Sequence, residues 1–225
     1  MHPALGLLGA YLLGSIPAAY VAGRMVKGID LRQHGSGNLG ATNVYRLLGG
    51  RVAAAVLLFD AAKGALPVAL FPNLLLAPDA TAERRLLWAI AYGVAAIAGH
   101  VRPIFLLWKG GGKGVATAAG VFASLVPIPA LLATVVFALV LWASGYVSLA
   151  SLTAAAILPV AVGALLGPVS PLFFLALLVG AFVFWTHRAN IGRLRRGEEH
   201  RFGRKARAAA PAADAGSAGG REGGA

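Results

Sequence analysis

The chain has 225 residues, of which 58% are hydrophobic and only 12% are charged. This composition, gathered in long apolar runs, excludes an ordinary soluble domain and is typical of a single polytopic membrane domain. Because the sequence holds no cysteine, disulfides and cysteine-ligated metal or iron–sulfur centres are excluded. The formal net charge of +12 lies in loops and the tail, so we assign it to membrane topology and anionic lipid headgroups, and we expect no nucleic-acid partner.

The apolar segments are close to or above the roughly 20 residues that cross about 30 Å of hydrocarbon. The first is polar at Ser15 and Tyr20 and lacks a strongly basic start, so we expect a retained helix and not a cleaved signal peptide. In chain order the segments are 4–23, 52–72, 86–106, 115–143, 146–166 and 168–186.

Basic residues concentrate in stretches 24–51, 99–114 and from 187 onward, which we therefore place on the cytoplasmic side. The connection 73–85 is nearly balanced in charge and fits the opposite side. An even number of crossings must then separate the second and third basic stretches.

The segment 115–143 is long for one crossing, and Pro127 and Pro129 interrupt its middle. Since proline removes a helix hydrogen bond and clashes with the preceding turn, we expect two helices here. The prediction is an all-α bundle of about seven transmembrane helices, with the N-terminus outside and the C-terminus cytoplasmic. One kinked, tilted helix and six crossings are the alternative.

We expect one integral-membrane domain over residues 1–205. The stretch 206–225 is rich in alanine and glycine and has too little apolar surface to order itself, so we expect a disordered tail. The chain shows no convincing internal repeat, so symmetry gives no support to an inverted-repeat transporter.

A first polar loop separates two of the apolar segments. It reads Gly35-Ser36-Gly37-Asn38-Leu39-Gly40-Ala41-Thr42-Asn43 and is followed by Arg46. Its glycines allow close backbone approach to a ligand, and its side chains supply hydrogen-bond donors and a fixed positive charge. This equipment indicates a phosphate site.

A second glycine-rich loop, Lys109-Gly110-Gly111-Gly112-Lys113-Gly114, directly precedes an apolar run. If a helix starts at Gly114, its free N–H groups and positive dipole end favour an anion beside the lysines. The spacing is not that of a nucleotide P-loop, because Lys113 is followed by glycine. A flexible basic turn at the membrane surface is the alternative.

The third cluster follows the last span. His187 and Asn190 are three residues apart, so they share one face of a helix at the membrane boundary. The surrounding arginines also fit a simple stop-transfer flank.

Asp60 and Lys63 stand in an apolar run on one helical face, where charges are costly unless they face the interior. They are either a pair that locks the bundle, which we favour, or the floor of a site. His100 and Ser148, near span ends, are ambiguous polar residues of the kind that more often satisfy backbone groups.

All three basic motifs fall on the same predicted side, which predicts a cytoplasmic-facing pocket for phosphorylated ligands beside enough apolar wall for an acyl chain. The motifs resemble the PlsY family of acyl-phosphate:glycerol-3-phosphate acyltransferases of the bacterial inner membrane. The resemblance covers nearly the whole chain to about residue 200. It rests on the first loop through Arg46, on Gly99-His100 through Pro103 with Gly111-Gly112-Lys113-Gly114-Val115-Ala116-Thr117, and on His187 through Asn190-Ile191, Arg193-Leu194, Gly197 and Glu198. Asp60-Ala61-Ala62-Lys63-Gly64 and Tyr146-Val147-Ser148-Leu149 also resemble family sequence.

The resemblance implies transfer of a fatty acyl group from acyl phosphate to the 1-hydroxyl of sn-glycerol 3-phosphate. The products are lysophosphatidic acid and phosphate, in the first committed step of phospholipid synthesis. A seven-helix multi-pass protein of the inner membrane, with its active site facing the cytoplasm, is also implied. Three glycines precede Lys113 where the family commonly has two. We align Lys113 with the family's anion-binding lysine, because the sequence Gly-Val-Ala-Thr follows it.

Site roles follow from the same resemblance. An acyl phosphate is already activated, so orientation, charge neutralisation and a route for the hydroxyl proton suffice. We assign phosphate to Arg46 and Lys113, and glycerol phosphate to His187 and Asn190. The proton goes either to His187 or to a substrate phosphate oxygen. Further expected contacts come from Ser36, Asn38, Thr42, Asn43, Gly111, Gly112, Gly114 and Ser148.

We expect no cofactor and no metal, since few acidic residues lie near the motifs. None of the five histidines is followed by aspartate five residues on, which separates the chain from acyl-CoA-dependent glycerolipid acyltransferases. The oligomeric state stays open, with a monomer as one option. A transporter for an organic phosphate is the competing class, and it would show polar residues along a path through the midplane. A scaffold binding anionic lipid explains the ordered glycine loops less well.

Overall fold

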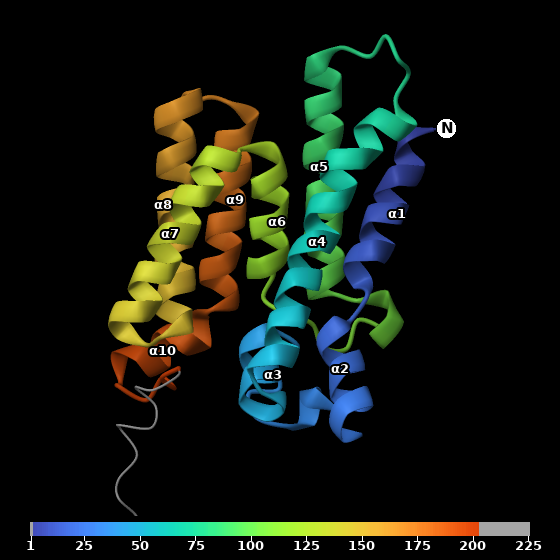
Figure 1. The fold of residues 1–225 in the computed structure, drawn as a ribbon. Coiled ribbons are helices and arrows are strands. Elements are labelled where there is room, and N and C mark those ends of the chain that lie inside the picture. Colours follow the sequence, from blue (N-terminus) through green and yellow to red (C-terminus); the bar gives the residue numbers. More distant parts are fainter. Residues whose placement is uncertain (1, 203–225) are drawn as a thin grey trace, which may run out of the picture.

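The computed structural model describes residues 2–202, and every regular element within that range is helical (Figure 1). The all-α class is therefore confirmed for the described residues, while the tail predicted from residue 206 lies outside them. The elements are α1 (Pro3–Ser15), α2 (Ala18–Lys27), η1 (Leu31–Gln33), α3 (Ala41–Leu48), α4 (Gly50–Leu75), α5 (Ala82–Val101), η2 (Ile104–Leu106), α6 (Val115–Leu125), α7 (Pro127–Ser144), α8 (Val147–Leu166), α9 (Pro171–Thr186) and α10 (Arg188–Arg195).

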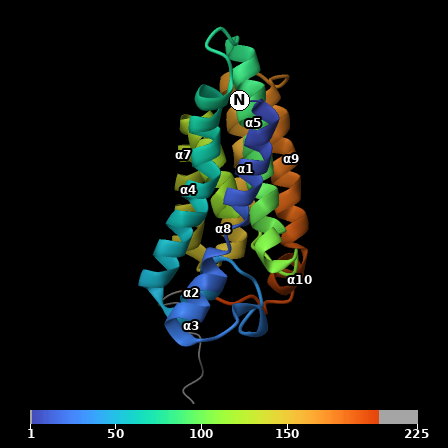
Figure 2. The same cartoon turned by 90° about the vertical axis from the view of Figure 1, so that its right-hand side faces the viewer.

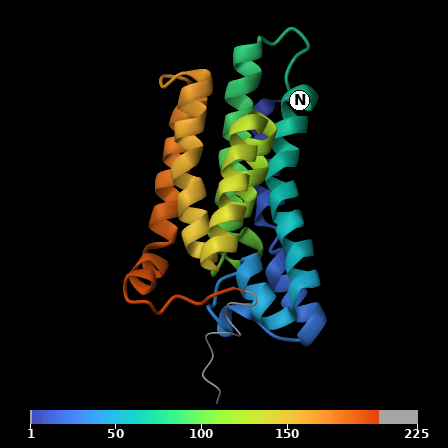
Figure 3. The same ribbon diagram turned by 60° about the vertical axis from the view of Figure 1, so that its left-hand side comes forward.

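Two groups of long helices form the bundle, and α6 joins them (Figures 1 and 2). Helices α1, α4 and α5 pack together in one group, and α8 packs on α7 and α9 in the other. Helix α6 packs mainly on α4 and also contacts α5, α7 and α9. Short connections join the helices at both ends of the bundle. The N-terminus and the loop after α4 lie at one end, and α2, α3 and α10 lie at the other (Figures 1 and 3).

The first predicted segment is broken near its middle, which the sequence analysis did not anticipate. Helix α1 ends at Ser15 and α2 begins at Ala18, because Pro17 has no N–H to continue the helix. The carbonyl of Ile16 instead accepts a hydrogen bond from Ala18 N at 3.1 Å and one from Lys63 Nζ at 2.8 Å. A buried lysine of α4 thus stabilises the break.

The break predicted at the paired prolines is confirmed. Helix α6 ends at Leu125 and α7 starts at Pro127, with Val126 between them. The 11 residues of α6 span roughly 16 Å at 1.5 Å per residue, which is shorter than a hydrocarbon core of about 30 Å.

Five helical stretches of the described chain are long and apolar enough to cross a membrane, and six if the pair of α9 and α10, bent by 59°, is one span. The five are Pro3–Lys27, Gly50–Leu75, Ala82–Leu106, Pro127–Ser144 and Val147–Leu166. Large apolar side chains such as Leu58, Leu139 and Val160 lie exposed on these helices, as lipid-facing surfaces require. The chain is therefore a multi-pass membrane protein.

Small residues set the helix spacing around α4 and α6. A Cβ added to Gly120 of α6 would meet the backbone carbonyl of Ala61 on α4, and one added to Gly64 of α4 would meet that of Thr117 on α6. Gly14 of α1 and Gly99 of α5 are equally close to the partner helix's backbone. Close backbone approach of this kind is how membrane helices associate without a hydrophobic driving force.

Gly120→Ala should therefore force α6 away from α4, because the added methyl group meets backbone and not a movable side chain. We expect a loss of about 1–3 kcal/mol, typical of overpacking, seen as a lower thermal unfolding midpoint in detergent. The matched control is Ala119→Leu at the neighbouring exposed position of the same helix. An equal effect of both substitutions would contradict the close-packing argument.

Candidate functional site

The three polar motifs meet at one end of the bundle. Helix α3, the loop after η2 and helix α10 all lie there, beneath the long helices (Figures 1 and 2). The chain after α10 runs below the bundle toward α3 (Figure 3). At its end the ring of Phe202 packs on that of Tyr45 in α3, with 4.2 Å between the ring centroids.

Asn43 shapes the first loop. Its side chain is almost fully buried, and its Oδ1 accepts a hydrogen bond from Ser36 N at 3.0 Å. Its Nδ2 donates to the carbonyls of His34, at 3.1 Å, and Leu31, at 3.3 Å. The amide thus folds the loop around itself and leaves the side chain of Ser36 exposed.

Two hydrogen bonds join the first loop to the second, and the same carbonyl accepts both. The carbonyl oxygen of Gly111 accepts hydrogen bonds from Leu39 N and from Asn38 Nδ2, each at 3.3 Å. A further bond runs from Arg32 Nη1 to the carbonyl of Lys109 at 3.0 Å. The two glycine-rich loops therefore form one unit.

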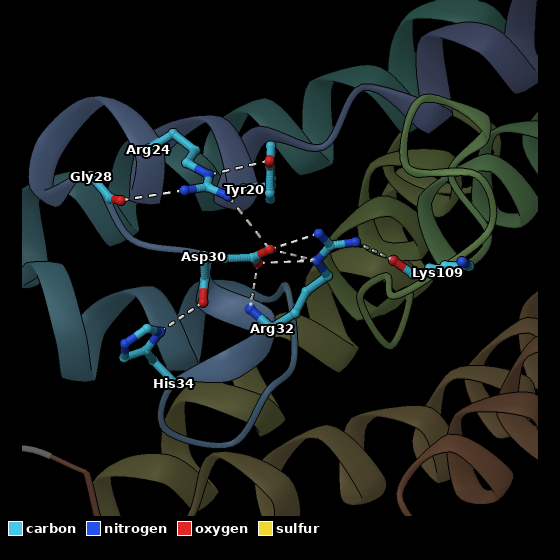
Figure 4. A network of polar contacts seen from close by, with 7 residues as sticks. All are labelled: Tyr20, Arg24, Gly28, Asp30, Arg32, His34 and Lys109. Carbon is cyan, nitrogen blue, oxygen red and sulfur yellow. Dashed lines mark hydrogen bonds and ion pairs between the residues drawn. The ribbon is translucent and has the colours of Figure 1, made fainter.

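Arg32 is itself fixed by Asp30, the centre of the network in Figure 4. Its Nη2 lies 2.6 Å from Asp30 Oδ2, while Arg24 reaches the same oxygen from the other side at 3.8 Å. The hydrogen bond from Arg32 lowers the pKa of Asp30 to about 2, against the opposing effect of burial. This carboxylate stays ionised at any physiological pH and holds Arg32 against the second loop.

The second loop ends at a helix N-terminus. Gly114 precedes α6 with φ of +83°, a left-handed conformation that favours glycine. The first N–H groups of α6 have no partner within the helix, so their partial positive charge faces the loop. This confirms that a helix starts after Gly114.

A cluster of side chains surrounds the carboxylate of Glu199, which is 8% exposed. Its Oε1 accepts hydrogen bonds from Ser148 Oγ at 2.9 Å and Asn190 Nδ2 at 2.7 Å, and its Oε2 accepts one from Arg193 Nε at 2.7 Å. Although burial acts to raise its pKa, these hydrogen bonds prevail, and the pKa of Glu199 is lowered. The carboxylate is therefore ionised at neutral pH.

Lys113 joins this cluster through Asn190, since its Nζ donates a hydrogen bond to Asn190 Oδ1. Burial lowers the pKa of Lys113 to about 8; the positive charges of Arg193 and Arg46 act in the same direction, and Glu199 opposes them. An anion that binds beside such a lysine stabilises its charged form.

His187 follows the last residue of α9 and is 3% exposed. Its Nδ1 lies 2.8 Å from the carbonyl of Val183. Since a carbonyl only accepts, Nδ1 carries the proton, and Nε2 is left as the acceptor nitrogen of a neutral ring. Burial, with the charge of Lys113 second, lowers the pKa of His187 to about 4. The ring is thus neutral at pH 7.

The structure gathers some predicted residues closely and places others apart. Asn190 and Ser148 are bonded directly to Glu199, and Lys113 is bonded to Asn190. His187 and Arg46 interact electrostatically with Glu199. Asn38 and Asn43 instead organise the first loop, and Thr42 lies one turn before Arg46 on α3.

Sequence reasoning missed the central place of Glu199 and gave Arg193 no role in the site. The available signal was a pair of glutamates within an otherwise basic stretch. It does not say which of the two turns inward. In the structure the exposed Glu198 pairs with Arg196, and Glu199 faces the cluster.

The fold and the site define an integral membrane protein of several helices, with cationic glycine loops gathered at one end of the bundle. The family model described as glycerol-3-phosphate acyltransferase matches residues 4–197. The chain belongs to this family and is accordingly an acyltransferase of phospholipid synthesis.

Named relatives and solved structures support the same family assignment. A protein named glycerol-3-phosphate acyltransferase from Geotalea daltonii is 46% identical over 198 residues, covering 88% of this chain and 96% of that protein. One of the same name from Myxococcus xanthus is 48% identical over 202 residues, covering 90% and 100%. Two crystal structures of PlsY, an integral membrane glycerol 3-phosphate acyltransferase, are similar to this chain. The glycerol 3-phosphate form has a TM-score of 0.77 at 37% identity, covering 89% of this chain and 96% of that one. The lysophosphatidic acid form has a TM-score of 0.76 at 38% identity, covering 89% and 95%.

Removing the charge of Glu199 should lower the pKa of Lys113 further, because this carboxylate opposes the depression. The pKa can be followed as the pH of half-maximal reductive methylation of Lys113, since only the neutral amine reacts. We expect half-reaction near pH 8 in the wild type and at lower pH in Glu199→Gln. Glu198→Gln, which removes an exposed carboxylate paired with Arg196, should leave the value unchanged. Equal shifts in both variants would disprove the local coupling.

Proposed function

We propose that this protein transfers a fatty acyl group from acyl phosphate to the 1-hydroxyl of sn-glycerol 3-phosphate, forming lysophosphatidic acid and inorganic phosphate. The observation that carries the proposal is the charge of the cluster. Lys113, Arg46 and Arg193 supply three positive charges around the single negative charge of Glu199. The excess of two positive charges matches the roughly −1.5 to −2 of a phosphate monoester at pH 7.

The loops supply neutral donors beside these charges. We assign the backbone N–H groups of Gly111 and Gly114, together with Ser36 and Asn38, to phosphate or to the oxyanion formed at the acyl carbon. The expected donor role of Gly112 is corrected by the structure, since its N–H donates to the carbonyl of His100 at 3.2 Å. Arg46 and Lys113 neutralise phosphate, and Thr42 and Ser148 add donors. Asn190 and His187 orient glycerol phosphate, while Asn43 acts by shaping the loop that presents Ser36.

The chemistry needs no covalent enzyme intermediate. The glycerol hydroxyl oxygen attacks the acyl carbon, the bond from that carbon to the phosphate oxygen breaks, and phosphate leaves. The hydroxyl proton goes to Nε2 of His187 or to an oxygen of the departing phosphate. The bond of Nδ1 to Val183 leaves Nε2 free to accept, which supports the first route, while the lowered pKa of His187 makes it a weak base and supports the second.

The basic residues at the motif end of the bundle also indicate how the protein is oriented in the membrane. We place the motif end at the cytoplasmic face of the bacterial inner membrane, since its basic residues obey the positive-inside rule. Seven crossings then result, counting α6 and α7 separately, with the N-terminus outside. All proposed site groups come from one chain, which supports activity as a monomer.

The activity test uses purified protein in detergent with palmitoyl phosphate, with and without glycerol 3-phosphate, while phosphate and lysophosphatidic acid are both followed. We expect equal, acceptor-dependent formation of the two products. Arg46→Ala should lower turnover by about 100-fold or more, as the loss of a charge that stabilises the transition state does. The control is Arg51→Ala, at an exposed arginine at the start of α4.

Product formed only from acyl-CoA would refute the proposed donor. No product from either donor, in folded protein that still binds glycerol 3-phosphate, would instead favour transport. Full turnover of Arg46→Ala at saturating substrate would refute the phosphate role of Arg46.

The crossing number is testable with single cysteines, because the natural sequence has none. Cysteines at Ala80, Ile128 and Arg195 mark the loop after α4, the exposed first turn of α7, and the end of α10. In intact cells, seven crossings predict labelling by a membrane-impermeant maleimide at 80 and no labelling at 195 until the membrane is opened. Residue 128 should behave as 80 does. If instead 128 behaves as 195 does, α6 does not cross.

A further inference from the structure

A buried cluster of charged and polar side chains lies between α1, α4 and α5, directly behind the glycine loops. Lys63 Nζ is 2.9 Å from Asp60 Oδ1, and both residues are 2% exposed. His100 of α5, 7% exposed, reaches the same carboxylate oxygen with its Nδ1 at 3.5 Å. Two helices thus converge on one carboxylate.

Lys63 holds the helix break that precedes the first loop. Lys63 Nζ donates to the carbonyl of Ile16 at the break between α1 and α2. The segment α2 that follows leads into the first polar loop. Asp60 therefore neutralises the charge that holds this break.

The histidine side touches the second loop. The carbonyl of His100 accepts a hydrogen bond from Gly112 N at 3.2 Å. Its ring lies so close to Gly112 that an added Cβ would collide with Nε2. At Gly111, by contrast, an added Cβ would meet the backbone carbonyl of Val101. The His100 imidazole thus packs directly against Gly112.

A small cavity separates the cluster from the loops. It is lined by Ser15, Asp60, Lys63, His100, Gly111 and Gly112, among others, and has room for about one water-sized molecule. Within residues 2–202, the buried Ser15 Oγ accepts and donates no hydrogen bond, and Asp60 Oδ1 has its ion-pair contacts but no well-directed hydrogen bond. The cluster and the two glycines of the second loop therefore line the same small cavity.

We propose that Asp60 and His100 are positioning residues: the Asp60 carboxylate orients the His100 imidazole, and the imidazole sets the place of Gly111 and Gly112 in the anion site. This rests on the proposed role of the loop in phosphate binding. Gly112 precedes Lys113, and Gly111 carries both hydrogen bonds from the first loop, so a shift here displaces both halves of the site.

A purely structural lock explains these contacts less well. Buried ion pairs contribute little net stability, since desolvation offsets their attraction, and apolar replacements of both partners are often neutral. A structural lock between Asp60 and Lys63 also does not explain why the Asp60 carboxylate lies against the His100 ring, which contacts the second loop. The two roles therefore predict different results for the same variants.

The first test compares Asp60→Leu/Lys63→Met with Asp60→Asn/Lys63→Met. Both remove the ion pair and the bond to Ile16, but only the asparagine keeps an acceptor for His100 Nδ1. We expect the leucine variant to raise the KM for a phosphate-bearing substrate, and the inhibition constant of inorganic phosphate, about tenfold or more. The asparagine variant should stay near the wild type in both, and kcat should change much less than KM.

The second test is steric and needs no change in the ion pair. His100→Asn alone should weaken phosphate binding, because asparagine lacks the ring that supports Gly112. Gly112→Ala should weaken binding in the wild type because its methyl group meets the His100 ring, and it should cause a smaller further loss in the His100→Asn background, where that ring is gone. Gly111→Ala is the matched control, since its methyl group meets backbone, and its effect should be the same in both backgrounds.

KM values are measured for palmitoyl phosphate and for glycerol 3-phosphate separately, which identifies the affected substrate. The proposal is overturned if the folded leucine variant has wild-type KM values and phosphate inhibition. It is also overturned if His100→Asn alone leaves phosphate binding unchanged, or if it reduces the effects of Gly112→Ala and Gly111→Ala equally. A wild-type protein inactive with acyl phosphate would refute the proposed function instead, and phosphate affinity measured by titration would still decide the positioning role.

Discussion

The site depends on how the 109–114 loop is held. Four separate parts of the chain bond to it: Arg32 at the carbonyl of Lys109, Asn38 with Leu39 at the carbonyl of Gly111, His100 at the N–H of Gly112, and Asn190 at the amine of Lys113. Such a glycine-rich segment loses much conformational freedom on ordering. It is ordered here because each end of it is tied to a different element, and those elements bring the first and third motifs to the same place.

The membrane makes this arrangement necessary. Backbone groups inside a bilayer must be satisfied by protein, so irregular segments occur only where other elements cover them. The break at Pro17 lets α2 leave α1 at the motif end of the bundle, and the close contacts of Gly64 and Gly120 hold the short helix α6 against α4. The same packing that shortens the crossing of α6 sets its N-terminus, and therefore Lys113, among the other cations.

Much of this follows from the sequence, and what does not has a physical cause. The helical class, the break at Pro127 and the helix start after Gly114 are local effects of apolar length, proline and glycine, and all three are confirmed. The break at Pro17 was missed because the segment around it is continuous in hydropathy, and the lysine that stabilises it is 47 residues away. The inward turn of Glu199 was missed for the same reason: its partners Ser148 and Asn190 come from other elements.

Glu199 is a negative group at the centre of a cluster of positive side chains. Alone, Lys113, Arg46 and Arg193 would repel one another in a partly buried cluster. Burial is the main cause of the lowered pKa of Lys113, and the positive charges of Arg193 and Arg46 add to it. The carboxylate offsets part of this repulsion and, through three hydrogen bonds, fixes the side chains of Ser148, Asn190 and Arg193. Because Asn190 in turn accepts from Lys113, the amine is directed before any substrate arrives. An enzyme that acts by positioning and charge stabilisation gains most from groups that are already in place and need no reorganisation during the reaction.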